Sequence, residues 1–136
     1  MKSKFWMVAA VASLAAGIPA YAHHSFAAEF DGSRPIVLHG KVTNVDWMNP
    51  HVFLRVDVAD AGGTVTNWTL ESAAPIYLEH LGWTRHSLKA GDTVTIRAYI
   101  AKDQPNFAKT DAVTLPNGRV VTTGRADDSA RDAASR

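Results

Sequence analysis

Apolar and polar residues alternate along several stretches of this chain with the two-residue period of a half-buried β-strand. The clearest alternation covers residues 51–58, and a second of the same kind covers residues 94–100. The predicted core is built from their apolar positions, above all Val52, Leu54, Val56 and Ile96. Further strands are predicted at 36–45, 65–71, 108–115 and 120–121.

Glycine, proline and asparagine mark the connections between these strands. Gly40 lies inside the first strand and predicts a bulge or a tight bend. A short helix is predicted from Ala73 to Leu81, because Pro75 suits a first helical turn and Gly82 stops the helix. Loops or turns are predicted at 31–35, 46–50, 61–63, 89–92, 103–106 and 117–118.

The predicted elements follow the order strand, strand, strand, helix, strand, strand. This is the order of a small five-stranded, OB-like Greek-key barrel, an all-β fold with one short helix between strands three and four. A bend at Gly40 agrees with that fold, because its first strand serves both sides of the barrel. A small open β-sandwich is the alternative, since element order alone does not fix the topology.

The first residues have the pattern of a secretory signal peptide. Lys2 and Lys4 precede an apolar run, and Ala20 and Ala22 supply the small residues of a cleavage site. The apolar run is shorter than the roughly 20 residues that span a bilayer. We therefore expect a periplasmic or secreted protein with no membrane insertion after cleavage. The expected organisation is a signal peptide at 1–22, a domain with an N-terminal arm at 23–123, and a disordered tail at 124–136.

Composition excludes several function classes. Loss of Lys2 and Lys4 with the signal peptide reduces the 14 basic residues to 12, against 13 acidic ones, so the mature chain is near neutral. Without a cationic face it is not expected to bind nucleic acid. The absence of cysteine excludes disulfides, thiolate metal sites and a cysteine nucleophile. The sequence also lacks a phosphate loop, a nucleophile elbow and the histidine pair of zinc hydrolases.

Histidines supply the candidate chemistry. Signal-peptide cleavage makes His23 the first residue of the mature protein, where its α-amine and ring nitrogen can chelate one metal ion. His51 begins a predicted strand and is the candidate for a second ring donor. Nitrogen donors in a plane suit Cu(II), so the sequence predicts copper at His23 and His51. His24 and Met48 are secondary candidates, the thioether of Met48 being suited to Cu(I).

Other conspicuous residues have structural interpretations. The larger aromatic residues are predicted to be mainly core, with a ligand-stacking face as the alternative, namely Trp47, Phe53, Trp68, Trp83 and Tyr99. The acidic residues near predicted strand ends are predicted to be turn and cap residues, namely Asp46, Glu71 and Asp92.

Long ordered motifs carry a family resemblance from residue 23 to about residue 121. They are His23–Phe26, Glu29–Asp31, Gly40–Val42, Val45–His51, Gly82–Thr84 and Leu88–Asp92. With these motifs the chain resembles an exported bacterial family carried as a domain of unknown function, DUF6152. The resemblance implies export and one small β domain. The segments 91–94 and 101–103 are similar, more loosely, to periplasmic OB-fold stress proteins.

These features predict a small exported binding protein rather than an enzyme, with copper binding or handling in the periplasm as its role. The alternative is an OB-like interaction module that binds a partner protein or a small ligand without metal. A copper enzyme is the third class and the least favoured. Removing 22 of the 136 residues leaves 114, which is little for a broad substrate surface.

Overall fold

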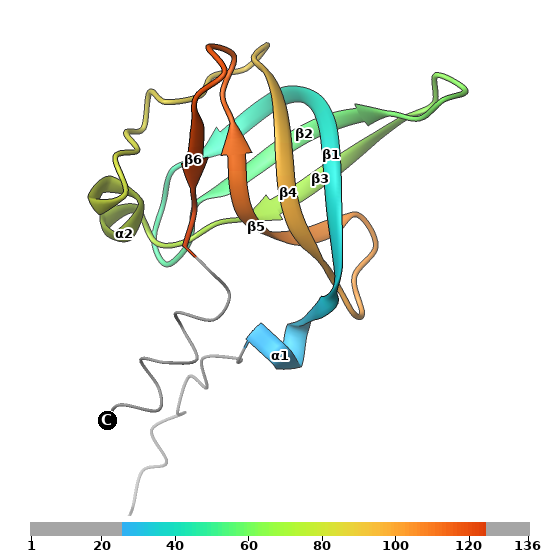
Figure 1. Ribbon diagram of the computed structural model, residues 1–136, viewed down its shortest axis with the longest axis horizontal. Coiled ribbons are helices and arrows are strands. Elements are labelled where there is room, and N and C mark those ends of the chain that lie inside the picture. Colours follow the sequence, from blue (N-terminus) through green and yellow to red (C-terminus); the bar gives the residue numbers. More distant parts are fainter. Residues whose placement is uncertain (1–25, 125–136) are drawn as a thin grey trace, which may run out of the picture.

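Two short helices and six β-strands make up residues 26–124, the part of the chain that the computed structural model describes (Figure 1). The strands are β1 (Phe30–Asp46), β2 (Phe53–Ala59), β3 (Val65–Glu71), β4 (Thr93–Ala101), β5 (Phe107–Thr114) and β6 (Val120–Thr122). The helices are α1 (Phe26–Glu29) and α2 (Pro75–His80). The predicted signal peptide, His23, His24 and the predicted tail beyond residue 124 lie outside the described residues.

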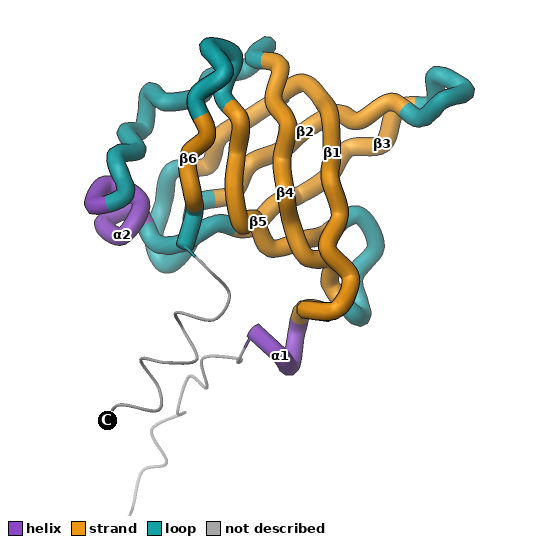
Figure 2. The backbone as a smooth tube through the Cα atoms, in the orientation of Figure 1, coloured by secondary structure: helices purple, strands orange, loops and turns teal. Residues whose placement is uncertain are grey.

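The strands form one sheet in the order β3-β2-β1-β4-β5-β6, with antiparallel neighbours (Figure 2). β3 also pairs with β5, in parallel, through residues 69–71 and 107–109. This additional pairing makes the hydrogen bonding ring-like, because it joins the two ends of the series β3-β2-β1-β4-β5. β6 pairs with β5 alone. The fold is therefore mostly β, and α2 lies between the third and fourth strands as predicted.

Apolar side chains from all the ring strands and α2 share one core. The predicted core residues are confirmed. Each is at most 1% exposed, namely Val52, Leu54, Val56 and Ile96. Trp83 is also buried, and its indole Nε1–H donates to the carbonyl oxygen of Thr122 at 2.9 Å. Trp47 and Trp68 pack against the core and are partly buried. The core interpretation therefore holds for these three tryptophans.

The first strand begins earlier than the sequence predicts. The predicted loop at 31–35 is wrong, because β1 includes these residues. The pairing of β1 with β4 is irregular there, with a register shift between Phe30 and Pro35. Turn chemistry is still present there: both the backbone N–H and the hydroxyl of Ser33 donate to Asp31 Oδ1, at 3.0 and 2.6 Å. These hydrogen bonds lower the pKa of Asp31. The turn-forming residues at 31–35 therefore make a bulge-like irregularity within a strand and not a free loop.

Gly40 lies where β1 passes from one partner to the other. Residues 35–41 pair with β4, and residues 41–46 pair with β2. A Cβ at Gly40 would overlap the carbonyl oxygen of Asp57 and approach Val56 Cγ1 to 2.6 Å. The glycine thus permits the close approach of two backbones that the bent strand requires.

An alanine at Gly40 is expected to lower the free energy of unfolding by about 1–3 kcal/mol, the usual cost of forcing extra atoms into packed structure. Urea denaturation of Gly40→Ala measures this. Gly32→Ala is the matched control in the same strand, because its Cβ would lie at an ordinary contact distance of 3.4 Å from Phe26 Cε1. Equal destabilisation by the two substitutions would show that close approach at residue 40 is not what matters.

Other element boundaries differ slightly from prediction. β2 begins at Phe53 rather than at residue 51, so His51 precedes the strand instead of opening it. α2 is shorter than the predicted helix by two residues at its start and one at its end. Asp92 closes its turn as predicted, accepting from the backbone N–H and the Nζ of Lys89 at 3.0 and 2.7 Å. Lys89 thereby lowers the pKa of Asp92.

Candidate functional site

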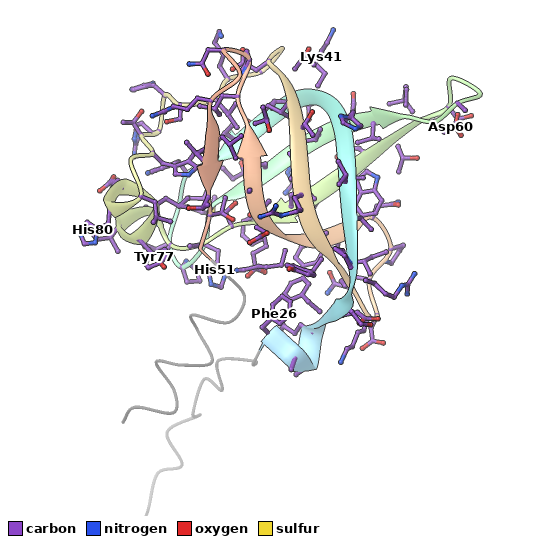
Figure 3. All side chains as sticks on the ribbon, viewed as in Figure 1. Phe26, Lys41, His51, Asp60, Tyr77 and His80 are labelled. Atoms are coloured by element: carbon purple, nitrogen blue, oxygen red, sulfur yellow. The ribbon has the colours of Figure 1, made fainter. Side chains whose placement is uncertain are left out.

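His51 lies in the segment between the cis Asn49–Pro50 peptide bond and β2. Its neighbour Val52 is buried and anchors this segment: the N–H of Val52 donates to the carbonyl oxygen of Ala73 at 3.0 Å, and its carbonyl accepts from the N–H of Ser72 at 2.8 Å. The side chain of His51 is 36% exposed. A fixed backbone therefore carries a ring that reaches the surface at one end of the sheet (Figure 3).

Glu71, the last residue of β3, brings His51 together with Lys109 of β5. Glu71 Oε1 lies 3.2 Å from His51 Nδ1 and 2.7 Å from Lys109 Nζ. The carboxylate is 11% exposed and the lysine side chain 20%. A buried carboxylate is costly unless a charge and hydrogen bonds compensate it. The parallel pairing places Glu71 directly opposite Lys109, which supplies that compensation. We call these three residues the Glu71 cluster.

Buried hydroxyl groups hold the backbone beneath the Glu71 cluster. Thr110 Oγ1 donates to the carbonyl oxygen of Glu71 at 3.0 Å and lies 2.6 Å from Ser72 Oγ. Because the Thr110 hydroxyl has one proton, Ser72 is the donor in the second contact. Lys109 Nζ also donates to the carbonyl oxygen of Ser72 at 3.0 Å. The position of Glu71 is thus set by several bonds to β5 and not by His51 alone.

A row of four phenylalanine rings connects α1 with β2 at this end of the sheet. Neighbouring ring centroids lie 5.6, 5.9 and 6.5 Å apart in the order Phe26, Phe30, Phe107 and Phe53. Such separations are typical of stabilising aromatic pairs. The row ends two residues after His51. Figure 3 shows Phe26 and His51 toward the same end of the molecule.

Further contacts hold α1 against the end of β4 and against Lys102, the residue that follows this strand. The ring of Phe26 meets that of Tyr99 edge-on, with centroids 5.5 Å apart. Lys102 Nζ donates to the carbonyl oxygen of Ala27 at 2.5 Å, and the backbone N–H of Lys102 donates to the carbonyl oxygen of Glu29 at 2.9 Å. The described start of the chain, within the predicted N-terminal arm, is therefore fixed to the sheet.

Of the other predicted site residues, Met48 lies within the described part of the chain and His23 and His24 do not. Met48 is 52% exposed in the loop that precedes His51. His23 and His24 fall outside residues 26–124, so their positions stay predictions. Among the described residues, no three His, Cys, Asp or Glu side chains form a group that could hold a metal ion.

Sequence reasoning missed the contact of His51 with Glu71 and the ion pair of Glu71 with Lys109. Glu71 is predicted to be a turn or cap residue, and this is wrong, because its side chain is buried beside Lys109. Thirty-eight residues separate the two, and only the β3–β5 pairing brings them together. A glutamate at the apolar end of a β-strand is the one signal in the sequence that could have drawn attention to this position. Asp46 likewise ends a strand, β1, and forms an ion pair, with Arg55 at 3.2 Å.

The fold and the site define a small, mostly β domain with the Glu71 cluster at one end. Residues 10–109 match the model of a family of unknown function, DUF6152, and the chain belongs to this family. This confirms the resemblance that its motifs carry. The match includes all three residues of the Glu71 cluster. Comparison with curated proteins and with solved structures gives no match.

The two helices within residues 26–124 are both short, and neither has the length and apolar character needed to cross a bilayer.

Proposed function

We propose that this protein is a small exported binding protein that holds copper at its mature N-terminus. The ligands are the α-amine and ring of His23 and the ring of His51, with His24 and Met48 as secondary donors. The observation that carries the proposal is the position of His51. Its ring is half-exposed on a fixed backbone toward the end of the molecule at which α1 lies (Figure 3).

The reach of the N-terminal residues supports the pairing of His23 with His51. Phe26 is clamped by Phe30 and Tyr99. An extended chain spans up to about 3.6 Å per residue, so the Cα atom of His23 lies within about 11 Å of that of Phe26. The row of phenylalanine rings leads from Phe26 to Phe53, the first residue of β2, which lies two residues after His51. The proposed pairing requires His23 to reach His51 over this end of the sheet.

The donor atoms favour copper over other metals. An amine and two imidazole nitrogens form a planar set, which suits Cu(II), and an exposed thioether at Met48 suits Cu(I). Neutral histidine is a common metal ligand. Signal-peptide cleavage before His23 is a condition of the proposal, since an internal residue has no free α-amine. The role is copper binding or handling in the periplasm, or outside the cell.

The ring-like bonding pattern supports a finer description of the fold. We infer that β1 to β5 form a five-stranded, OB-like Greek-key barrel, with β6 added to β5. Support comes from the ring order β1-β2-β3-β5-β4, the bend at Gly40, and the position of α2 between β3 and β4. In such a barrel the Glu71 cluster closes one end, where the parallel pair joins the ring.

Calorimetric titration with Cu(II) tests the proposal. The cleaved protein beginning at His23 is expected to bind one Cu(II) ion. An added residue before His23 removes the chelating amine, and His51→Ala removes a ring donor. Each change is expected to weaken binding by more than the roughly 10–100-fold that loss of an outer-shell partner costs. His80→Ala is the matched control, because His80 is exposed on α2 and plays no part in the proposed site.

Equal affinity in the cleaved, extended and His51→Ala proteins would exclude the copper site. The alternative would then lead, namely an OB-like interaction module that binds a partner protein or a small ligand without metal. A copper enzyme built on the same ligands would additionally need a substrate surface beside His51.

A further inference from the structure

Two nitrogen atoms lie close to a single oxygen of Glu71. Lys109 Nζ lies 2.7 Å from Oε1, and His51 Nδ1 lies 3.2 Å from the same atom. An ammonium group is a donor only and an ionised carboxylate is an acceptor only. The histidine ring is the one member of the Glu71 cluster that can act in either way, so Nδ1 can bond to the Glu71 carboxylate only as a donor.

We propose that Glu71 is a positioning residue for His51, holding the ring with its proton on Nδ1. Nε2 then carries the lone pair and is the atom that donates to a metal. Metal-binding histidines commonly give their other ring N–H to a carboxylate, which fixes the tautomer and the orientation of the ring. The assignment of Nε2 as a metal donor rests on the proposed function, whereas the tautomer does not.

The arrangement around Glu71 suits a positioning role. Its backbone is fixed by the Thr110 hydroxyl at 3.0 Å, and its carboxylate by Lys109. Because these bonds come from β5, the carboxylate is held by contacts other than the one with His51. The ring of His51 therefore turns to an oxygen that is already held, as preorganised binding requires.

A second interpretation is that Glu71 serves only to neutralise Lys109. A carboxylate that served only to neutralise this lysine would bind it through Oε1 and place no demand on the histidine tautomer. The two interpretations therefore differ in a property of the metal-free protein, namely the ring nitrogen of His51 that carries the proton.

Long-range ¹H–¹⁵N correlation spectra of the cleaved, metal-free protein identify that nitrogen. The measurement is made near pH 8, above the ordinary imidazole pKa of about 6.5. Wild type is expected to show the His51 proton on Nδ1. Glu71→Gln is expected to keep it there, since both donors contact one oxygen and the amide retains an oxygen. The double variant Glu71→Leu/Lys109→Met removes the acceptor without leaving an unpaired charge, and the Nδ1 proton is expected to be lost.

Two controls separate this effect from a general disturbance. His39 Nδ1 lies 2.9 Å from the hydroxyl of Thr95, which can donate or accept, and its signals are expected to stay unchanged in every variant. Glu79→Gln removes an exposed carboxylate from α2 and is expected to leave His51 unchanged.

Copper titration of the same proteins adds the metal readout. The double variant is expected to lose about 10–100-fold in Cu(II) affinity, and Glu71→Gln is expected to stay close to wild type. A wild-type proton on Nε2, or an Nδ1 proton that persists in the double variant, would overturn the inference. A wild-type proton on Nε2 decides the matter even if the double variant does not fold. If wild type carries the Nδ1 proton but binds no copper, the result counts against the proposed function and not against the role of Glu71.

Discussion

Truncation of Leu70 to alanine is expected to lower the free energy of unfolding by about 2–5 kcal/mol. Leu70 has no exposed surface, and it pairs with Leu54 of β2 on one side and Ala108 of β5 on the other. The side chain therefore supports the strand pair that makes the bonding ring-like. Its loss removes buried apolar area and leaves a cavity that the paired strands cannot easily close.

Urea denaturation of Leu70→Ala, followed by far-ultraviolet circular dichroism, measures the change. Val65→Ala is the matched control, since Val65 lies in the same strand with 58% exposure. The control is expected to change the free energy of unfolding by less than about 0.5 kcal/mol, as exposed substitutions usually do. Similar effects at the two positions would mean that the β3–β5 junction is not a packed core.

Replacement of Lys109 by methionine is expected to lower the free energy of unfolding by about 2–4 kcal/mol, somewhat less than the roughly 3–5 kcal/mol for breaking a fully buried ion pair. The substitution leaves the Glu71 carboxylate, 11% exposed, without the ammonium that lies 2.7 Å away. The carbonyl of Ser72 loses the same donor. The partial exposure of Lys109 moderates the loss, because water reaches part of the site.

The double variant Glu71→Leu/Lys109→Met distinguishes a lost contact from a stranded charge. Removing both charged partners is expected to recover most of the stability, because an apolar pair of similar size avoids the desolvation of either charge. Lys41→Met, at an exposed lysine of β1, is the control for loss of a positive charge alone (Figure 3). If Lys109→Met costs no more than Lys41→Met, the Glu71 carboxylate is better solvated than its burial indicates.

Local patterns predicted much of the secondary structure. The alternation at 94–100 matches β4, and the strand predicted at 65–71 has the bounds of β3. The glycines at turns occur with the expected backbone, since Gly63 and Gly118 have φ of 83° and 81°. These features depend on neighbours within a few residues, so a short window of sequence contains the forces that decide them.

Prediction failed where distant residues outweigh local preference. The turn residues at 31–35 form a bulge because the strand on either side pairs with β4. The short helix α1 forms at the point where Phe26 packs on Phe30 and Tyr99, a contact that no local pattern reports. Glu71 ends β3 rather than capping a turn, since Lys109 compensates its charge.

The sequence by itself determined the strands, the position of α2, the need for glycine in a bent first strand, and the histidines to consider. These follow from side-chain period, backbone freedom and ligand chemistry, which are properties of single residues and their near neighbours. Tertiary structure alone decided that β3 pairs with β5 and that His51, Glu71 and Lys109 meet. Residues far apart along the chain come together when the sheet buries its apolar faces, and that burial is a property of the whole domain.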